Sequence, residues 1–337
     1  MQRTVRPQRA GSLRNVLGFR GFFGYRGSSV FLVFVGFFLL FTFLSPEMRF
    51  VRPDNLRILL TDGSEFSIVV LGVGLLMICG EFDLSVGSIL VFCSFLFIRL
   101  FQGGVNLFAS LAAALAAGAA VGFLNGIITV KGRIPSFITT LGTMMFWRGI
   151  TLLLSEGFTA AFDQGQSARF TAFLTGEVGG IVPVQALWFV GIALALGVVL
   201  HFHRFGNWVY ATGGNLAAAR AMGIRTDLVK IACFTIVGIL CAFVGVTQAV
   251  RVSSFFSRAG DGWELKAVAA SVVGATALMG GRGSMAAIFL GALVISIIEN
   301  ALVMLRITYF WTYMVFGFVI IASLLFRTWL EKSRPGR

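Results

Sequence analysis

Long apolar stretches recur along the whole 337-residue sequence. A helix needs about 20 apolar residues to cross about 30 Å of hydrocarbon. Hydrophobic residues make up 57% of the chain and charged residues only 12%, a composition far from that of soluble domains. The stretches also lack the in-and-out alternation of a membrane barrel. The sequence therefore predicts an all-α, polytopic membrane bundle of about ten transmembrane helices, at residues 30–44, 66–80, 85–101, 106–129, 137–154, 184–202, 229–250, 267–280, 285–305 and 308–326.

The basic residues predict how these helices are oriented. The first 29 residues carry six arginines and no acidic residue, and Lys and Arg concentrate on the cytoplasmic side of membrane proteins. No small-residue cleavage site follows the first apolar stretch, so we interpret it as an uncleaved helix and not as a signal peptide. Ten spans return the basic tail to the cytoplasm. We expect an Arg-rich cytoplasmic N-terminus (1–29), a transmembrane domain (30–326) and a cytoplasmic tail (327–337).

Two of the expected spans, 66–80 and 267–280, are short and interrupted by glycine. They run into CGEFDLSVGS (79–88) and MGGRGS (279–284), and the predicted topology places both joints on the cytoplasmic side. Short, glycine-interrupted segments in corresponding parts of a chain indicate broken helices beside a transport path. The glycines of these two motifs that we single out are Gly87, Gly280, Gly281 and Gly283.

Charged residues in CGEFDLSVGS interrupt an apolar region where charge is costly. Asp83 and Ser85 directly precede the apolar run 86–96, so their side chains can cap that helix. The alternative is that they form part of a gate or substrate path. Glu81 is less constrained by its surroundings, and we expect it to face water.

A second charge lies within a span, because Arg148 falls more than halfway along residues 137–154. Such a charge needs a partner, water or a polar interior. Glu299 in the span 285–305 is a candidate partner, and the alternative is that each side chain extends to the outer interface. Asn125, Gln248 and Asn300 are further candidates for polar positions along a path.

A short helix is predicted in the long basic segment between two spans, within YATGGNLAAARAMGIRTDLVK (210–230). Asn215 can cap residues 216–222, and Gly223 is a natural stop. A helix of about two turns cannot cross a membrane. It exposes Arg220 and Arg225, so we expect it to dock on another protein, or alternatively to rest on lipid headgroups. The segment 251–266 is expected on the outside, where its aromatic residues meet a partner or the membrane interface.

Several function classes are disfavoured. The chain has no Gly-Lys-Ser/Thr phosphate loop, and its two histidines exclude an HExxH site. No Ser/His/Asp set is apparent, so a membrane hydrolase is disfavoured. The basic residues are scattered between apolar runs, which argues against a nucleic-acid partner. The four cysteines lie in apolar stretches, where small buried thiols are more plausible than disulfides or metal ligands.

Four stretches resemble the permease subunits of ribose/xylose/galactose-type ABC importers, in the same order. CGEFDLSVGS is similar to that family's G-x-x-DLSVGS signature, and the resemblance covers about residues 55–325. The others are RIPSFITTLGTMMFWRGITLLL (133–154), the 210–230 segment and ELKAVAASVVGATALMGGRGS (264–284). One departure is Glu81-Phe82, where relatives usually carry Gly-Ile, and it leaves the substrate class open.

The resemblance implies a multi-pass subunit of the bacterial cytoplasmic membrane that is not itself an enzyme. It implies a second permease copy, identical or related, and a cytoplasmic ATPase that binds ATP and Mg²⁺, so this chain holds no cofactor. A periplasmic or lipid-anchored sugar-binding protein delivers the substrate. The segment 207–227 would contain the coupling helix that docks on the ATPase, with Gly214, Asn215, Ala218, Arg220, Met222, Gly223 and Arg225.

Three alternatives to a monosaccharide importer stay open at this point. The first is a permease of the same superfamily for nucleosides or branched-chain amino acids. The second is a secondary transporter or channel that works alone, and copurification with an ATPase separates it from the first. The third, a membrane enzyme, needs a clustered catalytic set that the sequence does not contain.

Overall fold

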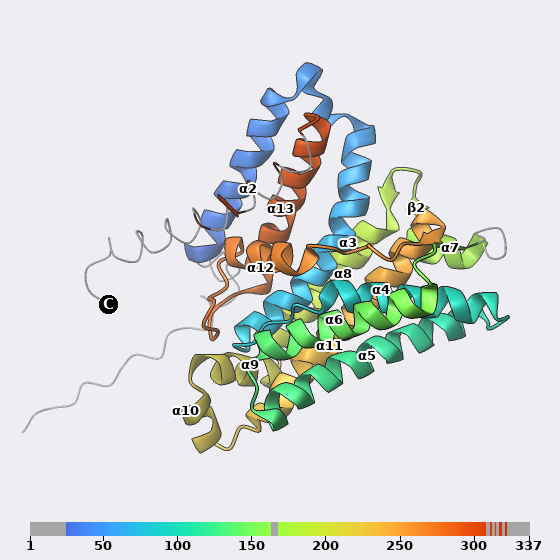
Figure 1. The fold of residues 1–337 in the computed structure, drawn as a ribbon. Helices are drawn as coiled ribbons and strands as arrows, with labels where there is room; N and C mark the ends of the chain where they lie inside the picture. Colours follow the sequence, from blue (N-terminus) through green and yellow to red (C-terminus); the bar gives the residue numbers. More distant parts are fainter. Residues whose placement is uncertain are drawn as a thin grey trace, which may run out of the picture.

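The computed structural model describes residues 25–162, 168–307, 311, 314, 317, 318 and 321. Within them the chain is almost entirely helical (Figure 1). The helices are α2 (Tyr25–Leu44), α3 (Pro53–Ile78), α4 (Val86–Gln102), α5 (Leu107–Gly132), α6 (Ser136–Ser155), α7 (Ala168–Thr175), α8 (Val184–Phe202), α9 (Arg204–Gly214), α10 (Leu216–Ala221), α11 (Thr226–Val252), α12 (Trp263–Val273) and α13 (Met285–Met304), with a 3₁₀ helix at Pro46–Val51.

Four two-residue strands complete the secondary structure of the described residues. Ala160–Ala161 (β1) pairs antiparallel with Ser254–Phe255 (β4), and Glu177–Val178 (β2) pairs antiparallel with Val182–Pro183 (β3). These short pairs hold the connections between helices together, and they do not form a sheet that contributes to the core. The predicted class, a helical and polytopic membrane protein, is confirmed.

In the described part of the chain, six helices are long and apolar enough to cross a membrane: α3, α5, α6, α8, α11 and α13. Two shorter apolar helices accompany them, α4 and the segment Ser29–Leu44 of α2. The predicted total of ten spans and the position of the two termini stay predictions. Residues 1–24 and 322–337, and most of the predicted span 308–326, lie outside the described residues.

The prediction of a short span at 66–80 is wrong. The helix α3 begins at Pro53 and runs for 26 residues. Asp62 and Glu65 lower the hydropathy of its first half, but both carboxylates pair with Arg251 of α11, so the helix continues through them. The second predicted short span, 267–280, corresponds to the short helix α12, which has only 11 residues. At about 17 Å it is too short to cross the hydrocarbon by itself, so its role as a span stays a prediction.

The helices α5 and α11 pack backbone to backbone. A Cβ atom at Gly118 would lie 2.4 Å from the carbonyl oxygen of Gly238, and one at Gly122 would lie 2.3 Å from that of Phe234. Small residues spaced four apart let membrane helices approach this closely. The tight pair α5–α11 then packs against α4 and α3. The helices α3, α4, α11 and α13 together carry most of the buried apolar side chains of the core.

Two ends of the molecule can be distinguished (Figure 1). We call one the α9–α10 end: there the connections 79–85, 133–135 and 274–284 lie next to the helices α9 and α10. We call the other the α7 end, where the strand pairs lie and where Gln102 donates to the carbonyl oxygen of Ala161.

Candidate functional site

The connection between α3 and α4 is an extended segment buried inside the bundle. The amide of Phe82 donates to the Ser136 hydroxyl (3.1 Å), and the amide of Leu84 donates to the Thr140 hydroxyl (3.1 Å). In the first turn of α4, the Ser88 hydroxyl donates to the carbonyl oxygen of Met144 in α6 (2.8 Å). The segment thus runs alongside the first turns of α6. Since a helix rises about 1.5 Å per residue, α4 begins roughly 6–12 Å deeper in the bundle than α6.

Asp83 lies at the inner end of this segment and is completely buried. Its Oδ1 accepts from the backbone amide (2.7 Å) and the hydroxyl (2.5 Å) of Ser85. The Asn125 amide group of α5 donates to the Ser85 hydroxyl (2.8 Å) and to Oδ2 of Asp83 (3.4 Å). We call these three residues the Asp83 cluster. Three of the predicted path residues therefore meet in one hydrogen-bonded group.

The prediction that Asp83 and Ser85 cap the following helix is wrong. Ser85 occupies the N-cap position, but no side chain caps α4. The reason is local, because an Asp side chain readily bonds the backbone two residues ahead. Asp83 does so here, and its carboxylate holds the turn from extended to helical backbone together. The prediction that Glu81 faces water is also wrong, since Glu81 is buried and pairs with Lys230 of α11.

Four glycines bring the ends of three segments into backbone contact, and we call them the glycine junction: Gly80, Gly213, Gly280 and Gly281. The amide of Gly281 donates to the carbonyl oxygen of Ile78 at the end of α3 (2.8 Å). A Cβ atom at Gly213, near the end of α9, would lie 2.0 Å from that same oxygen. The predicted motif glycines Gly280 and Gly281 thus join the loop after α12 to α3 and α9. Gly283 lies beside Ile78, and its carbonyl oxygen accepts from the Tyr210 hydroxyl (2.8 Å).

The predicted short helix is present as α10. The Asn215 side chain accepts from the amide of Ala218 (3.0 Å), and Gly223 adopts a φ of 81° after the helix ends. Met222 and Arg225 are exposed, as predicted for Arg225. Arg220 is also exposed, but its guanidinium is held by Asp227 (2.7 Å) and Thr226 (3.0 Å) of α11. Sequence reasoning missed α9, which immediately precedes Asn215.

The predicted pairing of Arg148 with Glu299 is wrong. Arg148 of α6 forms an ion pair with Asp261 (2.8 Å) and donates to the carbonyl oxygen of Ser257 (2.5 Å). Glu299 of α13 pairs with Lys266 of α12 (2.6 Å). The physical reason is that residues 253–262 fold back between the helices. Gly260 packs against Gly87, the remaining motif glycine, at the start of α4.

This returning segment also differs from the expected outer loop. Phe255 is buried against Phe95 of α4, and Trp263 packs edge-on against Phe66 of α3. The chain then continues as the short helix α12, whose Lys266 is buried. Non-helical backbone at membrane depth is tolerated where protein surrounds it. The described chain thus has two non-helical segments that pack against helices, one before α4 and one before α12.

Sequence reasoning missed the ion-pair cluster of Arg251. This residue ends α11 and binds Asp62 (2.9 Å) and, through two nitrogens, Glu65 (2.8 Å each) of α3. The signal was the i, i+3 spacing of the two acids on one helix face. The remaining candidates lie elsewhere: Asn300 accepts from Asn55 (2.9 Å), and the buried Gln248 Oε1 has no partner among the described residues. The four cysteines are free and buried.

These features define a multi-pass helical membrane protein whose described part has two non-helical connections packed among its helices. The family model for the permease component of a branched-chain amino acid transport system matches residues 55–324, and the chain belongs to this family. It is 36% identical over 285 residues to the ribose import permease protein RbsC of Escherichia coli K12, which covers 84% of this chain and 87% of that protein. No solved structure was found to match.

Other relatives are autoinducer 2 import system permease proteins named LsrC. That of Yersinia pseudotuberculosis (serotype O:3, strain YPIII) is 35% identical over 77% of this chain and 73% of its own length. That of Photorhabdus luminescens is 34% identical over 77% of each chain. The predicted class is thereby confirmed: the chain is a permease subunit of an ABC importer, a transport component and not an enzyme.

Proposed function

We propose that this chain forms the translocation path for a monosaccharide and that ATP hydrolysis on a partner subunit drives the import. The observation that carries the proposal is the similarity to the ribose permease over most of both chains. The sequence has no phosphate loop of its own, so ATP and Mg²⁺ are assigned to the partner. The second candidate substrate is a small signal of the autoinducer 2 kind, favoured by the similarity to the LsrC proteins.

The test is uptake into vesicles by the complex purified from its native host through a tag on this chain. We expect an ATPase and a solute-binding protein to copurify, and ribose or autoinducer 2 to enter only when ATP is present. Leucine and a nucleoside serve as competitors from the alternative substrate classes. Uptake by the isolated chain without an ATPase would overturn the proposal. Uptake of leucine but not of ribose or autoinducer 2 would show that the substrate is a branched-chain amino acid and not a monosaccharide.

The proposed assembly contains two permease copies, identical or related, in the bacterial inner membrane. The α9–α10 end faces the cytoplasm, because Lys131, Arg133, Arg204, Arg225 and Arg282 gather in its connections. The α7 end then faces the periplasm and receives the binding protein. Residues 1–29 and 327–337 are assigned to the cytoplasm, and 30–326 to the transmembrane domain.

The coupling segment, about 207–227, is proposed to dock on the ATPase through α10. When ATP closes the ATPase subunits, α10 moves with them, and α9 carries the movement to the glycine junction. There the backbone of α9 touches the end of α3 and the loop after α12. Both of those segments lie at non-helical connections, so the movement reaches the parts of the bundle that lack continuous helical hydrogen bonding.

Charge reversal at the exposed Arg225 tests the docking. Arg225→Glu is expected to lower substrate-stimulated ATPase activity about five- to tenfold, because the coupling between two sites typically changes affinities by that order. Subunit assembly should fall less. Arg204→Glu is the matched control, since Arg204 is exposed at the same end but outside the coupling segment. A loss of assembly larger than the loss of ATPase activity would contradict the coupling role.

The Asp83 cluster is proposed to hold the translocation path in shape. Asp83→Ala leaves the buried Ser85 amide and hydroxyl without their acceptor, which costs about 1–3 kcal/mol for an unsatisfied group. We expect lower uptake at equal protein levels. Ser94→Ala is the control, because among the described residues the buried Ser94 hydroxyl bonds only the carbonyl of Val91 in its own helix. Unchanged uptake by Asp83→Ala would remove the cluster from the path.

A further inference from the structure

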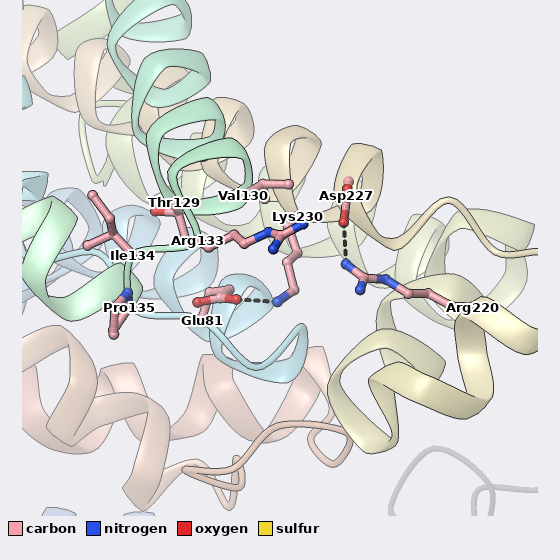
Figure 2. A pocket seen from close by; sticks show the side chains of 9 residues that line it. All are labelled: Glu81, Thr129, Val130, Arg133, Ile134, Pro135, Arg220, Asp227 and Lys230. Carbon is pink, nitrogen blue, oxygen red and sulfur yellow. Dashed lines mark hydrogen bonds and ion pairs between the residues drawn. The ribbon is translucent and has the colours of Figure 1, made fainter.

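A hollow of about 310 Å³ opens at the α9–α10 end, between the C-terminus of α5, the N-terminus of α6 and the coupling segment (Figure 2). Small-molecule sites have volumes of about 300–1,000 Å³, so the hollow can admit a headgroup-sized ligand. The residues that matter for its chemistry are Glu81, Thr129, Arg133, Arg220, Asp227 and Lys230. An adjoining hollow of about 380 Å³ includes Lys131.

The hollow is basic beyond its own internal ion pairs. Figure 2 shows Arg133, Lys230 and Arg220 extending toward the same space. Glu81 pairs with Lys230, and Asp227 pairs with Arg220. These pairs leave the charges of Arg133 and Lys131 without an acidic partner among the described residues. Two uncompensated cations, Arg133 in this hollow and Lys131 in the adjoining one, favour an anionic ligand.

A buried hydroxyl in the wall points to a ligand independently of the charge. Thr129 of α5 is only 6% exposed, and its Oγ1 has no hydrogen-bond partner among the described residues. Buried hydroxyls in proteins are nearly always hydrogen-bonded. An anion that bridges Thr129 and Arg133 would supply the missing acceptor.

The rim of the hollow indicates which anion fits. Ile134 lines the hollow and is exposed, and Phe137 and Ile138 continue this apolar surface along α6. Ile128 and Leu124 do the same along α5. These side chains lie where a membrane-crossing helix meets acyl chains. A ligand with an anionic head and apolar chains matches both the basic interior and the apolar rim, and basic pockets between spans on the cytoplasmic side bind such lipids.

We propose that this hollow binds the phosphate headgroup of an anionic phospholipid, with the acyl chains lying against α5 and α6. The proposal goes beyond the transport function. Arg220 of α10 and Asp227 of α11 form one wall, so the bound headgroup contacts the coupling segment. The lipid composition of the membrane would therefore affect how firmly α10 is held against α11.

The experiment uses the full chain in vesicles made of equal parts phosphatidylcholine and phosphatidylglycerol. After extraction, native mass spectrometry measures the phosphatidylglycerol retained per chain. We expect retention by the unaltered protein and a loss of about tenfold or more in the double variant Lys131→Gln/Arg133→Gln, since each basic residue near an anionic lipid contributes about 1 kcal/mol. Arg204→Gln, altered at the same end but outside the hollow, should retain the lipid.

Three outcomes would overturn the proposal. The first is equal retention of phosphatidylcholine and phosphatidylglycerol, and the second is unchanged retention in the double variant. The third is displacement of the lipid by inorganic phosphate or by the docked ATPase, which would assign the hollow to a free anion or to acidic side chains of that partner. Thr129→Val preserves the shape of the side chain and should lower retention by itself. Binding is measured without substrate, so a failed transport assay leaves the result intact.

Discussion

Gly213→Ala is expected to uncouple transport from ATP hydrolysis, whereas Gly214→Ala should leave it almost unchanged. A methyl group on Gly213 would lie 2.0 Å from the Ile78 carbonyl oxygen and 2.6 Å from the Gly281 amide nitrogen. Both neighbours are backbone, so the end of α9 must move away from α3. A methyl group on Gly214 meets only the Cα of Gly281, at 3.8 Å.

Mutations between two coupled sites typically change the coupling free energy by about 0.5–2 kcal/mol, or roughly two- to thirtyfold. Because the added methyl group meets backbone atoms on both sides, we expect Gly213→Ala to lie near the thirtyfold end of this range. Uptake and substrate-stimulated ATPase activity of the reconstituted complex measure the effect, with basal ATPase activity as the internal reference. Equal activities of the two alanine variants would show that the glycine junction carries no movement.

Arg251→Ala is expected to destabilise the fold by about 3–5 kcal/mol, the usual cost of removing one partner from a buried ion pair. The side chain of Glu65 is 1% exposed and would lose both of its hydrogen bonds from Arg251. The variant would therefore lose the ion pairs that join the last turn of α11 to α3. Equilibrium unfolding in detergent, followed by tryptophan fluorescence, gives the free energy.

Arg258→Ala is the matched control for this measurement. Arg258 lies in the returning segment shortly after Arg251, but its side chain is 91% exposed, and exposed pairs contribute about 0–1 kcal/mol. The double variant Arg251→Met/Glu65→Gln should recover part of the loss because it leaves no unpaired buried charge; Asp62, which also loses Arg251, is 57% exposed and stays solvated. A similar loss of stability in Arg251→Ala and Arg258→Ala would contradict a special role for the buried pair.

Features that depend on nearby residues could be predicted from the sequence. The helix α10 is an example, since its cap at Asn215 and its end at Gly223 lie within nine residues. The bounds of α8 follow in the same way from an uninterrupted apolar run. The four motif stretches identified the family because they occur together and in order.

Features that depend on distant parts of the chain could not be predicted. Arg148 had an apparent partner in Glu299, but its true partner lies on a segment that folds back from the far side of the bundle. The length of α3 was underestimated for a similar reason, because Arg251 neutralises its acids from 186 residues away. A hydropathy scale gives a charged residue the same value whether or not an ion pair neutralises it, so it places the start of α3 too late.

The hydroxyl groups that bond the buried extended segment limit which substitutions the protein can accept during evolution. Two amides of the CGEFDLSVGS stretch, those of Phe82 and Leu84, depend on Ser136 and Thr140, which lie 54 and 56 residues further along the chain. Loss of either hydroxyl orphans an amide that lipid cannot solvate. We therefore expect residues 79–88 and the start of α6 to evolve together. A relative in which one of the two hydroxyls is replaced by a methyl group should carry a compensating change in residues 79–88.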